Sequence, residues 1–206
     1  MIKFLFLLVS VFAFSQNIKP SVITSAEYEI QQKTVQAYDE QVINRIPEQI
    51  RKKYERVEKF LPHNDTLFLV IQNKKKGIID LNGITVVPAD HQFIEAHTYE
   101  TVAPGKYEMY MIGYSDVSVP QRYYSNHGSL IVESYSPFSP STENGQIIKV
   151  GTKDGKIQFF NIPAGKLINN KKYDKAPGSF VNGVLKVERI GNNYLLNQSG
   201  LETKIN

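Results

Sequence analysis

The sequence predicts a mainly β protein with an N-terminal helical segment, an α+β arrangement in which a β-hairpin repeat array follows two helices. Three observations predict it. Apolar residues recur every three or four positions between residues 24 and 61, which is typical of helices. Short apolar runs separated by Gly and Asn turns follow from residue 63 onward. One of these turn units recurs near the C-terminus, which indicates a repeat.

The first 15 residues have the three regions of a signal peptide. One positive charge precedes the apolar run Phe4–Phe14, which is too short for a membrane span of roughly 20 residues. Ala13 and Ser15 are small, as a signal peptidase requires, so we expect cleavage before Gln16. The alternative is a buried N-terminal helix or strand. The predicted organisation is a signal peptide at 1–15, a helical segment at 16–62 and a β module at 63–206.

Composition argues against several function classes. The chain has no Cys, which excludes thiol catalysis, Cys-ligated metals and disulfides, and argues against a lipoprotein. Its four His follow no metal-binding spacing, so we expect no metal, no cofactor and no enzymatic activity. The formal net charge of +4 is spread along the chain, so we expect no nucleic-acid partner. Basic runs at 51–53 and 74–76 fit solvated surfaces or contact with anionic envelope polymers. After signal removal, we expect no integral membrane segment.

The helical segment is expected to divide at Pro47. Thr24 and Glu27 fit a capping box at its start, and Pro62 ends the apolar pattern. Because proline lacks a backbone donor and clashes with the preceding turn, Pro47 starts a new helix. We predict two helices, at about 25–45 and 47–61. Their apolar stripe docks on the β module itself or on a partner protein.

A β-hairpin is predicted around Asn82 and Gly83. Both residues can take a positive φ that matches the twist of the flanking strands, and apolar runs lie on either side. Leu67–Ile71 is predicted to be a buried strand that leads into this hairpin through a Lys-rich turn at 74–77. Pro88 cannot donate to a strand ladder, so the third strand ends there or lies at a sheet edge.

A similar unit lies in the last third of the chain. Gly165 and Gly200 begin units 35 residues apart, a period within the range of repeat architectures. Aligning Phe159–Asn161 with the earlier unit requires a one-residue insertion before Gly165. We expect a diverged unit in the middle of the chain, where 124–132 fits a Phe-x-x-Gly-x-apolar-x-Val element with one extra residue.

The order of residues in these units resembles a known family. The chain is similar to WG repeats, also called KWG repeats, in the order of three elements. These are Gly-apolar-Ile-Asp-x-x-Gly-x-x-Val-Val-Pro at 77–88, Tyr173-Asp174, and Phe-x-x-Gly-x-apolar-x-Val at 180–187, which is followed by the next Gly turn. The chain departs from the family in having no Trp, and Asn193-Tyr194 stands where the last Trp-Gly pair would be. The resemblance implies a β-rich repeat scaffold without catalytic activity.

Two sets of residues are candidate sites. Exposed Tyr rings bind sugars or peptides by stacking and through their hydroxyls, although Tyr rings also pack inside sheets. The candidate binding surface consists of Tyr107, Tyr110, Tyr114, Tyr123 and Tyr124. Thr66 is a candidate O-glycosylation acceptor, because Asp65-Thr66-Leu67 resembles an acceptor pattern of some bacterial envelopes and follows a turn. The alternative makes Thr66 an ordinary strand residue.

These observations predict an exported protein, periplasmic or secreted. Its expected function is that of a non-catalytic scaffold or binding module of the bacterial envelope, with a protein or an envelope polysaccharide as its partner. One alternative is a carbohydrate-active hydrolase that uses carboxylates such as Asp80 and Asp90. The other is an adaptor whose N-terminal helices bind a protein partner.

Overall fold

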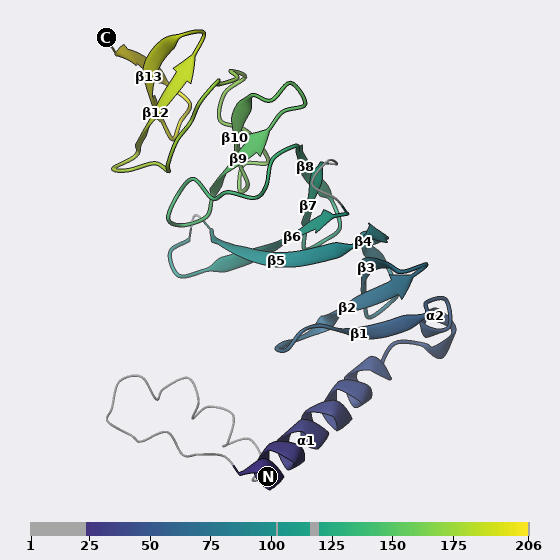
Figure 1. Ribbon diagram of the computed structural model, residues 1–206. Helices are drawn as coiled ribbons and strands as arrows, with labels where there is room; N and C mark the ends of the chain where they lie inside the picture. Colours follow the sequence, from purple (N-terminus) through teal and green to yellow (C-terminus); the bar gives the residue numbers. More distant parts are fainter. Residues whose placement is uncertain (1–23, 102, 116–119, 206) are drawn as a thin grey trace. The chain divides into compact units, whose positions relative to one another are not determined.

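The computed structural model describes residues 24–101, 103–115 and 120–205 (Figure 1). The predicted signal peptide lies outside the described residues. The chain divides into two compact units between Gln41 and Val42. None of the described helices is long and apolar enough to cross a membrane.

Helix α1 spans Ser25–Ile43 and begins with the predicted capping box. Thr24 Oγ1 accepts a hydrogen bond from the backbone N–H of Glu27 at 3.3 Å, and the Thr24 N–H donates to Glu27 Oε2 at 2.9 Å. Two donors at the helix start are therefore satisfied by this pair. The Thr24 N–H and the Thr24 hydroxyl both donate to the Glu27 carboxylate, which lowers the pKa of Glu27.

The second helix is much shorter than predicted. Helix α2 starts after Pro47 as expected but spans only Glu48–Arg51. The prediction of a helix to residue 61 is wrong, because strand β1 occupies Arg56–Leu61. Val57 pairs with Val70 across the ladder, and the Glu55 N–H donates to the Ile71 carbonyl at 2.9 Å. Pairing with a distant strand thus overrides a local spacing that also fits a helix.

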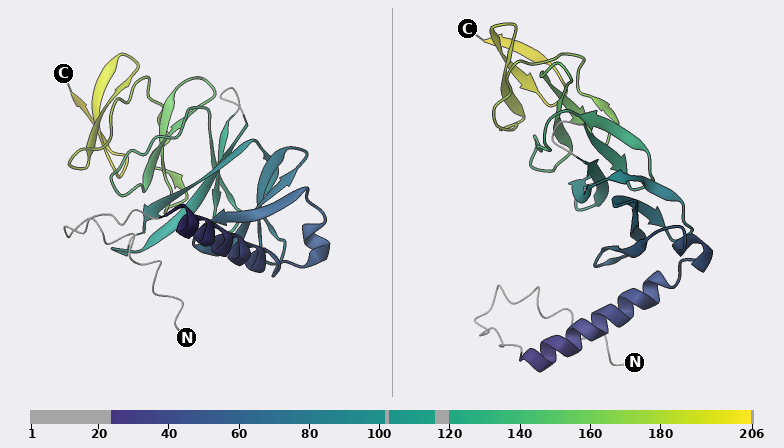
Figure 2. Two further views of the ribbon diagram at one scale, coloured as in Figure 1. Left: turned by 60° about the horizontal axis from the view of Figure 1, so that its bottom comes forward. Right: turned by 45° about the vertical axis from the view of Figure 1, so that its right-hand side comes forward.

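Four antiparallel sheets form the rest of the chain, which confirms the mainly β prediction (Figures 1 and 2). The first sheet has the order β1-β2-β3-β4 and adds β2 (Asn64–Gln72), β3 (Lys75–Asp80) and β4 (Thr85–His91). The second sheet consists of β5 (Phe93–Glu100), β6 (Tyr107–Tyr114), β7 (Gln121–Ser125) and β8 (Leu130–Ser134). The third has the order β11-β10-β9, with β9 (Ile147–Gly151), β10 (Ile157–Asn161) and β11 (Lys166–Leu167). The fourth consists of β12 (Val184–Arg189), β13 (Asn192–Asn197) and β14 (Glu202–Ile205).

Consecutive sheets share hydrophobic cores, so they form an array along the chain. In the third sheet, Ile148 and Phe160 join the core shared with the second sheet, whereas their neighbours Ile147 and Phe159 join the core shared with the fourth. A sheet buried on both faces therefore has adjacent apolar residues instead of alternation. The first sheet is covered on its outer face by side chains that include Val42 and Ile46.

The fourth sheet has one buried face and one exposed face. Along β12, exposed and buried residues alternate, with Leu185 and Val187 buried and Val184 and Lys186 exposed. Alternation is typical of a sheet with one buried face and one solvated face.

The predicted β3–β4 hairpin is confirmed, although its turn is longer than two residues. Only Gly83 has a positive φ, of 78°, and the Gly83 N–H donates to the Asp80 carbonyl at 3.0 Å. A two-residue turn with both φ positive lies instead at Asn73-Lys74, so the Lys-rich turn falls slightly before the predicted position. Strand β4 continues through Pro88 and lies at the sheet edge. Of the two predicted alternatives, a strand that ends at Pro88 or an edge strand, the second is therefore correct.

The last hairpin of each sheet contains a similar turn. A glycine with positive φ occupies each one: Gly83 (78°), Gly128 (88°), Gly165 (61°) and Gly200 (88°). A polar side chain at the end of the preceding strand accepts backbone N–H bonds within the turn: Asp80, Ser125, Asn161 and Asn197. Gly128 thus occupies the repeat turn of the diverged middle unit, and not the strand element to which the sequence assigned it.

Candidate functional site

Three of the four repeat-turn glycines lie against another part of the array. A Cβ atom on Gly128, in the second sheet, would lie 3.1 Å from the Cα of Val86 in the first sheet. On Gly200 it would lie 2.8 Å from the carbonyl carbon of Ile168, which follows the third sheet, and closer still to the oxygen. On Gly83 it would lie 2.7 Å from the side chain of Ile50, which belongs to the core outside the first sheet. The contact at Gly200 is with backbone and would force the chain to shift, whereas those at Gly128 and Gly83 are tighter than ordinary van der Waals contacts.

Gly165 is the exception. None of the described atoms lies within 4 Å of a Cβ built on it. The turn from Asn161 to Gly165 has one residue more than the turn from Asp80 to Gly83, and the Gly165 N–H donates to the Ile162 carbonyl at 3.1 Å. The extra residue, which the sequence alignment required, thus coincides with a turn that stands away from the preceding sheet.

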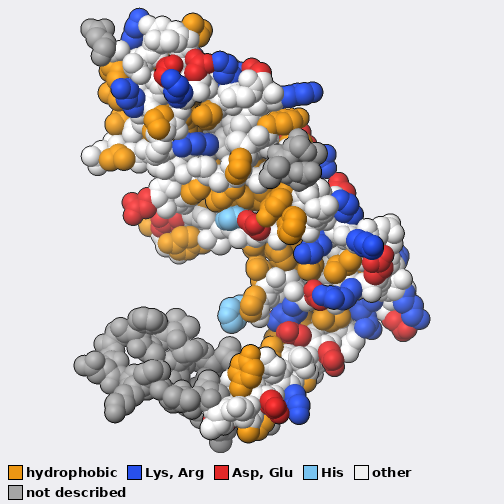
Figure 3. Space-filling view, viewed as in Figure 1, with side chains coloured by type: hydrophobic (Ala, Val, Ile, Leu, Met, Phe, Trp, Pro, Cys, Tyr) orange, Lys and Arg blue, Asp and Glu red, His pale blue; other side chains and the backbone are white. Residues whose placement is uncertain are grey.

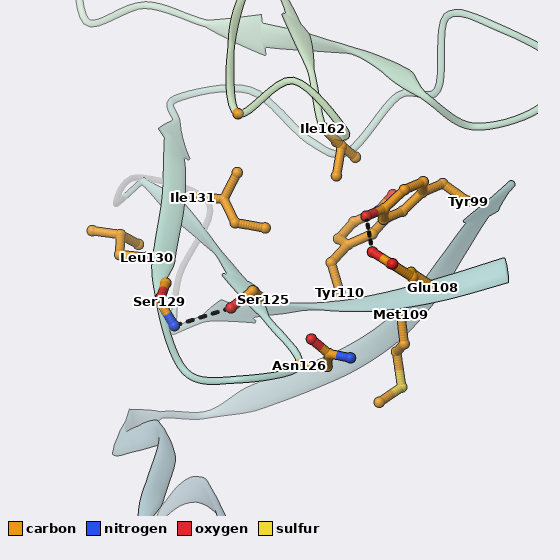
Figure 4. A pocket seen from close by; sticks show the side chains of 11 residues that line it. Tyr99, Glu108, Met109, Tyr110, Ser125, Asn126, Ser129, Leu130, Ile131 and Ile162 are labelled. Carbon is orange, nitrogen blue, oxygen red and sulfur yellow. Dashed lines mark hydrogen bonds between the residues drawn. The ribbon is translucent and has the colours of Figure 1, made fainter. Parts of the chain in front are cut away.

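A cavity of about 280 Å³ lies at this turn (Figure 4). Strands β5 and β6, the β7–β8 turn and the turn after β10 contribute its lining. The lining residues are Tyr99, Glu108, Met109, Tyr110, Ser125, Asn126, Ser129, Leu130, Ile131, Ile162 and Gly165. Tyr99, Tyr110 and Glu108 lie on one side, with Leu130 and Ile131 opposite them in Figure 4.

The polar side of the cavity is built by one cross-strand pair. Tyr99 on β5 lies opposite Glu108 on β6, and the Tyr99 hydroxyl donates to Glu108 Oε2 at 2.5 Å. Burial, followed by this hydrogen bond and the Glu108 charge, raises the pKa of Tyr99 to about 12. Tyr99 therefore keeps its proton at neutral pH and holds the Glu108 carboxylate in place.

Tyr110 makes this side rigid. Its ring stacks on Tyr123 with centroids 6.1 Å apart and on His97 with centroids 5.6 Å apart. Tyr110 and Tyr123 are both buried, and burial raises the pKa of each hydroxyl. The cavity thus rests on a packed aromatic core, and not on a loop.

The opposite side is held by the β7–β8 turn. Ser125 Oγ accepts backbone N–H bonds from Ser129 at 3.1 Å and from His127 at 3.3 Å. These bonds fix the turn that carries Asn126 and Leu130 to the cavity. Ile162 is buried and belongs to the core between the second and third sheets, so the inserted turn is anchored as well.

The predicted tyrosine surface is not assembled. Tyr110, Tyr123 and Tyr124 are buried, so the alternative of core packing holds for these three. Tyr107 is 66% exposed, and Tyr114 donates to Glu95 Oε1 at 2.5 Å. Tyr110 is the one residue of the five that lines the cavity. The sequence interpretation missed Tyr99, Glu108 and Asn126. The one signal in the sequence that pointed to this site was the inserted residue before Gly165.

The other candidate residues have structural partners. Thr66 lies exposed on β2, and its Oγ1 donates to Asn64 Oδ1 at 2.7 Å. Asp80 Oδ1 accepts hydrogen bonds from the Asn82 and Ile84 N–H groups at 2.9 and 2.8 Å, so this carboxylate stabilises the β3–β4 turn. Asp90, the other carboxylate of the hydrolase alternative, lies 2.8 Å from His91 Nε2 and forms an ion pair with Arg122 at 3.0 Å.

The surface differs in character along the array. Figure 3 shows hydrophobic side chains gathered over the second and third sheets, whereas Lys, Arg, Asp and Glu are denser over the fourth. Within the described part of the chain, no three His, Asp or Glu residues are grouped so that they could hold a metal ion.

Comparison with known proteins adds no identification. No family model and no curated protein matches the chain. BamB from Moraxella catarrhalis is 14% identical with a TM-score of 0.30, and the match covers 68% of this chain and 58% of that chain. The computationally designed Ika4 protein is 14% identical with a TM-score of 0.28, covering 68% and 84% of the two chains. At these TM-scores neither likeness carries an argument about this protein.

Proposed function

We propose that this chain is an exported, non-catalytic binding module of the bacterial envelope, a diverged WG-repeat scaffold whose ligand binds in the cavity beside Gly165. The observation that carries the proposal is that the turn at Gly165 is not packed against a neighbouring segment. The repeat turns at Gly83, Gly128 and Gly200 lie close to a neighbouring segment, and the turn at Gly165 leaves a cavity instead.

A departure from a repeating rule is where a functional site is expected. The departure here has rigid walls, because Tyr99 and Tyr110 pack in the core and Ser125 fixes the facing turn. Polar groups from Glu108 and Asn126 line the cavity together with apolar side chains such as Ile131 and Ile162. A concave site with apolar walls and a few polar groups is typical of ligand binding.

Blocking the cavity tests the proposal. In Asn126→Trp, an indole enters the cavity from the β7–β8 turn, whereas His127→Trp places the same group on the adjacent residue, which does not line it. The mature chain and both variants are screened against envelope polysaccharide fragments and peptides by calorimetry. We expect binding that Asn126→Trp abolishes and His127→Trp preserves. Binding that neither variant changes would place the ligand elsewhere and overturn the proposal, and turnover of a polysaccharide would support the hydrolase alternative.

Export needs its own test, since it rests on the sequence of the first 15 residues. Alkaline phosphatase fused after residue 30 is active only when the fusion leaves the bacterial cytoplasm. We expect activity from the native leader and its loss when two Leu residues of the apolar run are replaced by Asp. Equal activity in both fusions would contradict export through this segment.

The adaptor alternative is favoured by a separate observation on α1. Tyr28 and Val35 lie seven residues apart on the same helix face, and both are more than half exposed. Removing residues 16–41 leaves Val42 and Ile46 in the core of the β module. A folded remainder that no longer retains a partner bound by the mature chain would support the adaptor function.

A further inference from the structure

We infer that the group that enters the cavity is the side chain of a lysine on a partner polypeptide. This inference rests on the proposed function, because it names the ligand of the same site. The cavity volume of about 280 Å³ is at the lower end of small-molecule pockets, which span roughly 300–1,000 Å³. It has room for one extended side chain and not for an oligosaccharide.

The charge of the lining selects a cation. Glu108 is the single Asp, Glu, Lys, Arg or His among the lining residues. Two other carboxylates of the β module form ion pairs, Glu133 with Arg122 at 2.9 Å and Glu202 with Arg189 at 2.9 Å. Among the described residues, no cationic side chain forms an ion pair with Glu108, although the chain has a net charge of +4. Glu108 is exposed at the mouth of the cavity, so its carboxylate is open to a cationic group of a ligand.

The geometry of Glu108 favours lysine over arginine. Its Oε2 is already engaged by the Tyr99 hydroxyl at 2.5 Å, which leaves Oε1 as the available oxygen. An arginine guanidinium binds best when it reaches both carboxylate oxygens at once, whereas a lysine ammonium is a compact charge that needs only one. The remaining ammonium protons can be taken by the oxygen of the Asn126 amide at the same cavity.

The apolar walls match the rest of a lysine side chain. Ile131 and Ile162 line the cavity, and a lysine stem buries its methylene groups against such surfaces. A sugar ring would instead need an exposed aromatic face, and Tyr99 and Tyr110 are only 8% and 1% exposed. The lining therefore combines one carboxylate with apolar walls and lacks a stacking platform.

Peptide display tests the inference without a known partner. A random peptide library is selected on the mature chain and depleted on Asn126→Trp, so that only cavity-dependent binders remain. We expect one lysine at a fixed position among these binders. Its replacement by norleucine, which keeps the stem and removes the ammonium, is expected to weaken binding by about 10- to 100-fold, as the loss of a charge-assisted hydrogen bond predicts.

Matched carboxylate variants complete the test. Glu108→Gln keeps an acceptor for Tyr99 and removes the charge, whereas Glu143→Gln removes the same charge from an exposed residue outside the cavity. We expect Glu108→Gln to weaken binding by about tenfold or more and Glu143→Gln to change it less than about twofold. Cavity-dependent binders without lysine, or binders insensitive to Glu108→Gln, would overturn the inference and leave the proposed function standing. A library that yields no cavity-dependent binder, together with no cavity-dependent polysaccharide, would overturn both.

Discussion

Replacing Gly200 by Ala tests how the repeat turns pack. Gly200 has a φ of 88°, and its new Cβ would lie 2.8 Å from the carbonyl carbon of Ile168 and 3.2 Å from the Cβ of Asn169. An Ala at positive φ costs about 1–2 kcal/mol. Forcing an extra methyl against backbone costs a further ~1–3 kcal/mol. We therefore expect Gly200→Ala to lower the free energy of unfolding by about 2–5 kcal/mol.

Ala substitutions at two other glycines separate the cost of the positive φ from the cost of the close contact. Gly155 and Gly165 have φ values of 75° and 61°, and none of the described atoms lies within 4 Å of a Cβ on either. Ala at these positions adds the backbone cost alone, about 1–2 kcal/mol. Gly165 is the stronger control, since it occupies the repeat turn that corresponds to Gly200.

The assay is thermal unfolding of the mature chain and the three variants, followed by circular dichroism. For a domain of this size each kcal/mol corresponds to about 2–4 °C in Tm. Gly200→Ala is thus expected to melt about 2–12 °C below Gly165→Ala. Equal Tm values for these two variants would refute the reasoning, because they would mean that the Gly165 turn is packed as closely as the Gly200 turn.

Three further predictions concern single positions. Ile190 has a φ of 52°, which costs a β-branched residue about 1–3 kcal/mol, so Ile190→Asn is expected to raise the urea midpoint; an unchanged midpoint would argue against strain. Burial lowers the pKa of His91, so the native state resists a proton that the unfolded chain accepts below about pH 6.5. The free energy of unfolding should fall from pH 7.5 to 5.5, and less steeply in His91→Gln. Glycan addition at Thr66 predicts an intact mass above that of residues 16–206 from the native host, with the excess lost in Thr66→Ala.

Local features of the fold could be predicted from the sequence. The Thr24–Glu27 capping box and the hairpin closed by Gly83 depend on residues a few positions apart, so both can be recognised in the sequence alone. The strand at Arg56–Leu61 could not be predicted in this way. Its apolar spacing also fits a helix, and only its ladder with β2 decides between them.

The tyrosines show a second reason for failure. In the second sheet, Tyr123 joins the core shared with the third sheet and its neighbour Tyr124 joins the core shared with the first. A strand buried on both faces loses the alternation that separates inside from outside in a sequence. The candidate site could not be predicted for a related reason. The insertion before Gly165 is visible in the sequence. Whether neighbouring side chains fill the resulting space depends on residues from β5, β6 and the β7–β8 turn, which lie far from it in the sequence.

The cavity also bears on the mechanics of the array. Each hydrophobic core joins one sheet to the next, so the sheets behave as links in series. Between the second and third sheets, the turn at Gly165 leaves an open cavity where the turns at Gly83, Gly128 and Gly200 are packed against a neighbouring segment. A side chain seated there would contact the second sheet and the turn after β10 at once, and would so add to the packing between these two parts of the array.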